Sequence, residues 1–200
     1  WGPVNTSCDH LNLGATEGHW IGEAGGASES VSVMLLMFDS QPITDFGALG
    51  SIDYAELHLY VEATDTMPTD TIVWANLMPA GDPWAWVEGN LNAEEPGDAD
   101  GFTTYKYQYF ASTPWPNSNP FPPQPIDFGG INIAGLSGES ELVMGIDQNL
   151  VAEWFEPDTL GNMHNGVMVG SNAPVHSLLS FAREHNGRAQ AAHIEIHACF

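Results

Sequence analysis

The 200-residue sequence has very few basic residues. Three Lys and Arg residues stand against 26 Asp and Glu residues, which gives a formal net charge of -23. Affinity for nucleic acid and for anionic membrane surfaces depends on clustered Lys and Arg, so the composition excludes both as partners. Two explanations of the acidity stay open. The negative charge keeps a surface protein soluble, or it is balanced by cations in the surroundings, such as Ca²⁺, the cations of high salt, or protons at low pH.

The sequence also has no long hydrophobic run and almost no helical pattern. The longest apolar run, residues 31–38, is far shorter than the roughly 18 residues that cross a bilayer, so we expect no membrane insertion. Glycine (21 residues) and proline (14 residues) interrupt the chain every few positions. Strand-like segments recur between them. We therefore expect one all-β domain over residues 1–200, a jelly-roll β-sandwich of about nine or ten antiparallel strands with long loops.

The clearest strand pattern covers residues 53–63, where apolar and polar side chains alternate. Side chains that alternate along a strand point to opposite faces of the sheet. One face is predicted to enter the core and the other to face water. The core set is Ala55, Leu57, Leu59 and Val61, and the water-facing set is Glu56, His58, Tyr60 and Glu62.

There are only two cysteines, Cys8 and Cys199. Two cysteines that bracket the chain predict a disulfide, and hence an oxidising, extracellular location at or near a cell surface. The alternative is two free buried thiols. Asn5 begins an Asn-Thr-Ser sequon beside Cys8, so it is a candidate for glycan attachment.

Five short motifs follow one another between residue 31 and the end of the chain. They are residues 37–39 with 45–46 and 55–60; residues 86–90 with 100–103; residues 115–116; residues 151–154 with 165–169; and residues 180–184 ahead of 193–198. This order resembles the DNRLRE (disaggregatase-related) jelly-roll domains of secreted bacterial and archaeal proteins. The resemblance implies a jelly roll with an extracellular role in surface display or carbohydrate binding, and it implies no catalytic residues.

Two candidate metal sites are visible in the sequence. An acidic, glycine-containing turn carries four carboxylates suited to Ca²⁺, or it is an ordinary acidic turn; these residues are Glu94, Glu95, Asp98 and Asp100. The C-terminal strand places His193, Glu195 and His197 on one face. If Cys8 and Cys199 pair across neighbouring antiparallel strands, His10 lies opposite His197, and the histidines suit Zn²⁺ or Cu²⁺. The alternative is a polar outer face.

Aromatic residues in the loops provide a third kind of candidate site. Trp84 and Trp115 lie in two long, proline-containing segments, residues 76–101 and 112–130. Exposed aromatic rings stack on sugar rings, so the two tryptophans are candidates for carbohydrate contact, or they fill the ends of the core. No Gly-x-Ser-x-Gly or His-Glu-x-x-His motif occurs. A glycoside hydrolase or lyase is therefore the minor alternative to a protein without catalytic activity.

Two functions from different classes follow from these patterns. The first is a secreted structural or adhesive protein that self-associates into an extracellular filament, sheath or surface coat. The second is a carbohydrate-binding module for an extracellular polysaccharide. Calcium is the expected cofactor if there is one.

Overall fold

The computed structural model describes thirteen segments of the chain. They are residues 18–23, 31–32, 34–38, 50–64, 72–77, 107–109, 113–114, 127–134, 136, 140–153, 166–171, 177–181 and 192–199. This part of the chain consists mostly of antiparallel strands with little helix, so the expected all-β class is confirmed for it. No helix in these segments is long and apolar enough to cross a membrane.

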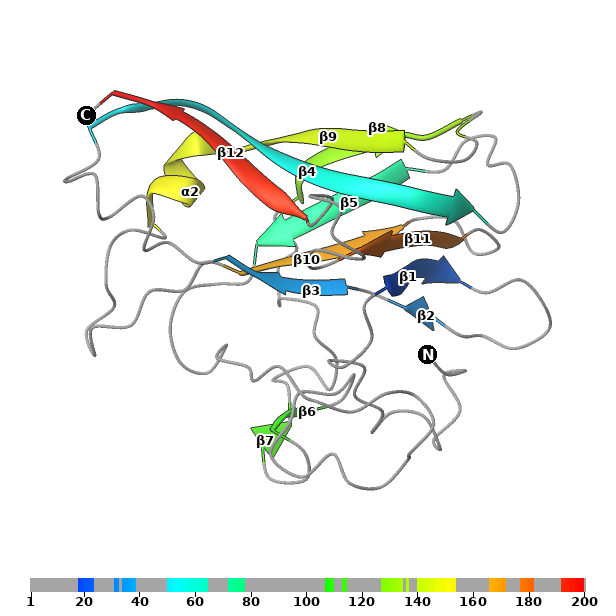
Figure 1. The fold of residues 1–200 in the computed structure, drawn as a ribbon. Helices are drawn as coiled ribbons and strands as arrows, with labels where there is room; N and C mark the ends of the chain where they lie inside the picture. The colour runs from blue at the N-terminus through cyan, green and yellow to red at the C-terminus, as the bar shows by residue number, and fades with distance from the viewer. Residues whose placement is uncertain are drawn as a thin grey trace.

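The larger sheet has six strands arranged around one long central strand (Figure 1). The order β12-β4-β11-β1-β2 forms one path, and β9 also pairs with β4. The bounds are β1 Gly18–Glu23, β2 Val31–Ser32, β4 Ile52–Thr64, β9 Ser140–Ile146, β11 Ser177–Phe181 and β12 His193–Ala198. Strand β4 therefore has β9 along one edge, while β12 and β11 follow each other along the other edge.

The smaller sheet has four strands in the order β3-β10-β5-β8. Its strands are β3 Met34–Met37, β5 Ile72–Leu77, β8 Asp127–Asn132 and β10 Gly166–Ser171. A separate short pair joins β6 Tyr107–Tyr109 to β7 Thr113–Pro114 and lies away from both sheets in Figure 1. One short helix, α2 Gln148–Glu153, follows β9 directly.

The predicted alternation in β4 is confirmed. Ala55, Leu57, Leu59 and Val61 are at most 2% exposed. Glu56, His58 and Tyr60 lie on the other face and are only partly exposed. Strand β12 follows the same rule, because Ile194 and Ile196 pack against the core while His193 and Glu195 are exposed.

Both sheets contribute to one hydrophobic core. Ile21, Leu57 and Leu142 of the larger sheet share a cluster of buried residues with Met34 and Val167 of the smaller sheet. A shared cluster means that the apolar faces of the two sheets pack against each other. The opposite face of the larger sheet is thus left to carry polar side chains.

The longest apolar run, residues 31–38, is divided between the two sheets. Strand β2 pairs with β1 in the larger sheet, whereas β3 pairs with β10 in the smaller one. Apolar residues on both sides of a strand indicate burial but do not indicate which sheet the strand joins. Strand β1 was not predicted, because its sequence, GHWIGE, has little alternation and two glycines.

Candidate functional site

The candidate site lies on the polar face of the larger sheet, where three neighbouring strands carry ionisable side chains. Strand β4 provides Glu56 and His58. Strand β9 provides Glu141 on one side of them, and β12 provides His193 and Glu195 on the other. We call these five residues the His–Glu cluster. Each of the five has the strand parity opposite to the core-facing apolar residues of its own strand, which explains why they gather on one face.

The register between β4 and β12 places similar side chains directly opposite each other. His193 pairs with His58, and Glu195 pairs with Glu56. Like charges at directly opposite positions destabilise a sheet. The three basic residues of the sequence, Lys106, Arg183 and Arg188, all lie outside the described residues, so within the described part no Lys or Arg compensates the two glutamates.

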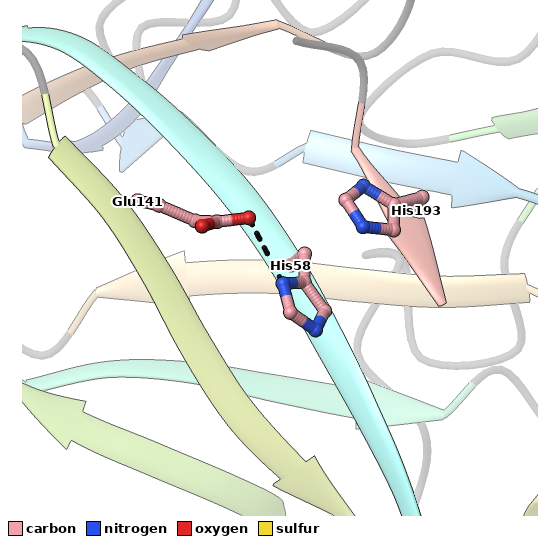
Figure 2. A group of neighbouring side chains, drawn as sticks. All are labelled: His58, Glu141 and His193. Atoms are coloured by element: carbon pink, nitrogen blue, oxygen red, sulfur yellow. Dashed lines mark hydrogen bonds and ion pairs between the residues drawn. The ribbon is translucent and has the colours of Figure 1, made fainter. Parts of the chain in front are cut away.

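His58 is the central residue of the cluster and the most enclosed. Its side chain is 12% exposed, compared with 56% for Glu141 and 48% for Glu195. Its Nδ1 atom lies 2.9 Å from Oε1 of Glu141. Figure 2 shows Glu141 reaching His58 from β9, while His193 approaches from β12. An ionised carboxylate only accepts hydrogen bonds, so the Nδ1–H group of His58 donates to Glu141.

The other ring nitrogen of His58 is in a different situation. Nε2 is buried and has no hydrogen-bond partner among the residues that the structure describes. Oε2 of Glu195 lies 3.5 Å from it. In a neutral ring whose proton is on Nδ1, Nε2 carries a lone pair. That lone pair and the carboxylate oxygen are both acceptors, so their approach is favourable only with a positive charge between them.

Two pairs of stacked aromatic rings lie on the same polar face as the cluster. The imidazoles of His58 and His193 stack with centroids 4.5 Å apart and an interplanar angle of 16°. The rings of Tyr54 and His197 stack at 3.9 Å and 17°. His197 also donates from Nε2 to Oε1 of Glu195. These contacts order the side chains on an otherwise open face.

Tyr54 stands at the exposed end of this face, with 46% of its surface accessible. Desolvation raises the pKa of its phenol above the ordinary value of 10.0. The carboxylates of Glu56, Glu195 and Asp53 raise this pKa further, because the negative phenolate is disfavoured near them. The carboxylate contribution to this raised pKa reflects the negative potential on this face, in addition to the larger effect of desolvation.

The structure describes four of the residues that the sequence singled out. His193, Glu195 and His197 share the polar face of β12, as expected. Cys199 is a free, exposed cysteine. The remaining candidates lie outside the described residues, so their predicted roles stay predictions: Asn5, Cys8, His10, Trp84, Glu94, Glu95, Asp98, Asp100 and Trp115.

Sequence patterns alone did not indicate a role in the site for three residues of the cluster, which are Glu56, His58 and Glu141. The face of Glu56 and His58 was predicted correctly, but nothing in the sequence indicated that β4 lies next to β12. The predicted neighbour of β12 was the segment around Cys8 and His10. Nothing in the sequence indicated which strand lies beside the segment that carries Glu141. Alternation identifies the face of a strand and not its partner.

Two overlapping sets in the cluster have the spacing of metal ligands. One set is His58, Glu141 and His193, and the other is Glu56, His58 and Glu195. In each set, one ligand atom per residue lies within 4.8 Å of the others. Imidazole and carboxylate together suit divalent transition metals, whereas Ca²⁺ selects oxygen ligands. The cluster is therefore not evidence for the predicted calcium site.

Comparison with known proteins adds no relative to this picture. No protein-family model matches the chain, and no curated protein matches its sequence. The resemblance to DNRLRE domains therefore stays a prediction.

Proposed function

We propose that this chain is a secreted, non-catalytic structural or adhesive protein that self-associates into an extracellular filament, sheath or surface coat. The observation that carries the proposal is the position of β12. Among the described strands, β12 pairs with β4 alone, so it lies at one end of the larger sheet. A sheet edge has backbone N–H and C=O groups that can pair with a strand from another molecule.

The jelly-roll topology of the two sheets is part of this proposal. A jelly roll of about nine or ten strands would leave such edges between its two sheets and would project its long loops towards neighbours. The shared core of the two sheets supports a sandwich of this kind. The strong net negative charge of -23 supports an extracellular setting in which cations screen repulsion between copies.

Assembly is tested by imaging and light scattering. Purified protein is examined by negative-stain electron microscopy across a range of salt and Ca²⁺ concentrations. We expect ordered polymers that a synthetic peptide of residues 192–199 shortens, since it occupies the same edge, and that a scrambled peptide leaves intact. A monomer under every condition contradicts the proposal. Polymers whose length is unchanged by the peptide would show that the contact between copies is not the β12 edge.

A carbohydrate-binding module is the second candidate, and Tyr54 favours it. Its exposed ring, ordered by the stack with His197, lies beside Glu56 and Glu195 on an open face. Aromatic rings next to carboxylates can stack on a sugar and accept its hydroxyl hydrogen bonds. A glycan array tests this candidate. Binding that is lost in Tyr54→Ala and kept in Val143→Ala supports it, and an array without any binding removes it.

A further inference from the structure

We propose that the His–Glu cluster binds one divalent transition-metal ion, with Nε2 of His58 and the carboxylates of Glu56 and Glu195 as its protein ligands. This site goes beyond the structural role proposed above and does not depend on it. Three independent features of the cluster lead to it: the state of the imidazole, the spacing of the ligand atoms, and the charge on the opposing strands.

The imidazole of His58 is already arranged as a metal ligand. A histidine that binds a metal through one nitrogen usually donates its other N–H to a carboxylate, which fixes the tautomer and makes the ligand more basic. Glu141 accepts from Nδ1 at 2.9 Å in this way. The opposite nitrogen, Nε2, is buried with no hydrogen-bond partner in the described part of the chain. An unmatched buried acceptor is costly, and a metal ion would satisfy it.

The spacing between the atoms fits a metal. Two ligands of a tetrahedral Zn²⁺ with bonds of about 2.1 Å lie roughly 3.4 Å apart. The distance from Nε2 of His58 to Oε2 of Glu195 is 3.5 Å. A carboxylate oxygen of Glu56 lies within 4.8 Å of one ring nitrogen of His58 and of one carboxylate oxygen of Glu195. With Glu56 as the third protein ligand, a tetrahedral ion keeps a fourth position for water or a partner.

The charge on the two strands favours the same conclusion. Glu56 and Glu195 are directly opposite each other in the β4–β12 pairing, which is unfavourable for two carboxylates without a cation. A divalent ion neutralises both. His197 donates to the second oxygen of Glu195, so Oε1 is occupied and Oε2 is left to face His58.

The second set of residues, with Glu141 and His193, suits a single ion less well. A metal lies in the plane of each imidazole that binds it. The rings of His58 and His193 are nearly parallel and 4.5 Å apart, so they cannot share one ion without rotation of a ring. We therefore assign His193 and Glu141 to positioning: His193 packs on the face of the ring and Glu141 fixes its proton.

Metal binding is tested by calorimetric titration of the EDTA-treated 200-residue chain with Zn²⁺, in the presence of excess Ca²⁺ and Mg²⁺. We expect one site per chain that is lost in His58→Gln and weakened more than about 10-fold in Glu56→Gln and Glu195→Gln, while Glu141→Gln costs about 10- to 100-fold. Two matched controls are expected to bind normally. His19→Gln removes an imidazole from β1, where His19 pairs with Ser180, and Asp53→Asn removes one carboxylate from β4 at the opposite parity to Glu56.

A spectroscopic measurement on the unaltered protein decides the matter even if a variant fails to fold. In ¹⁵N-detected imidazole NMR, we expect Zn²⁺ to shift Nε2 of His58 while Nδ1 keeps its proton. Two outcomes overturn the proposal. One is Zn²⁺ binding that survives both His58→Gln and Glu195→Gln. The other is a His58 ring that stays protonated on both nitrogens and ignores Zn²⁺, because that ring would be an imidazolium held between Glu141 and Glu195.

Discussion

Glu56 and Glu195 lie directly opposite each other where β4 pairs with β12. Without a bound cation, the two carboxylates repel each other, so we expect Glu56→Gln to stabilise the metal-free protein by about 0.2–1 kcal/mol. Urea unfolding in EDTA measures the change in the free energy of unfolding. Salt screens exposed charges, so the gain is expected to shrink as ionic strength rises.

The control for this charge change is Asp53→Asn, which removes one negative charge from the other parity of the same strand. We expect it to change the free energy of unfolding by less than Glu56→Gln. Equal stabilisation by both variants would mean that the net charge matters and the pairing of Glu56 with Glu195 does not.

Tyr54 gives a prediction about pH. Desolvation, followed by the carboxylates of Glu56, Glu195 and Asp53, raises the pKa of its phenol in the folded state above 10.0. The unfolded chain therefore loses the phenol proton first as pH rises. The stability contribution is fully present below the ordinary pKa and is lost as pH rises through the folded pKa.

Tyrosinate absorbance during an alkaline titration measures this pKa, and subtraction of the Tyr54→Phe titration isolates it from the other four tyrosines. We expect Glu56→Gln to move the pKa back towards 10.0, since it removes one of the carboxylates that raise it. A Tyr54 that titrates below 10.0 in the folded protein would contradict the negative potential that we describe for this face.

Gly50 and Gly145 form a matched pair for testing the packing at β4. Gly50 donates its N–H to the carbonyl of Cys199 at 2.8 Å, and an added Cβ would lie 2.7 Å from that oxygen. The carbonyl is backbone and cannot move aside easily, so Gly50→Ala is expected to destabilise by about 1–3 kcal/mol. A Cβ on Gly145 meets nothing within 4 Å, so Gly145→Ala is expected to be neutral or slightly stabilising. Denaturant midpoints with unchanged slopes check both values.

Leu57 tests the separation of the two faces of β4. It is 0% exposed and lies between Glu56 and His58 in sequence, so Leu57→Ala is expected to cost about 2–5 kcal/mol. Val143 of β9 pairs with His58 on the polar face and is 37% exposed. Val143→Ala is expected to stay within about 0.5 kcal/mol of the parent. Comparable losses in both variants would mean that the polar face is also packed against something.

The alternation of side chains made most of β4 and β12 predictable. In β4, the sequence placed Leu57 and His58 on opposite faces, and this is confirmed: Leu57 is 0% exposed in the core, whereas His58 lies on the polar face. In β12, the same reasoning placed His193 and Glu195 on the polar face. Such predictions succeed because the side-chain period of a strand is a local property that the chain carries wherever the strand is placed.

The neighbours of these strands were not predictable in the same way. His58 and Glu141 are 83 residues apart, yet they share a hydrogen bond. The pairing of β4 with β9 and β12 is set by the packing of the whole core, and neither the spacing of His58 nor that of Glu141 contains it. The polar face of β12 predicted a metal site with His193, Glu195 and His197, but no pattern in the sequence indicated His58, which is central to the ligand set proposed above.

The arrangement of β4 between distant strands has a consequence for how the protein folds. Its partners β9, β11 and β12 all come from the second half of the chain. Closing loops of this length costs chain entropy before any contact rewards it, so domains dominated by such pairings fold slowly. Until those partners are in place, both edges of β4 are open to mispairing with other copies of the chain, and we expect the charges of Glu56 and Glu62 to make such pairing unfavourable.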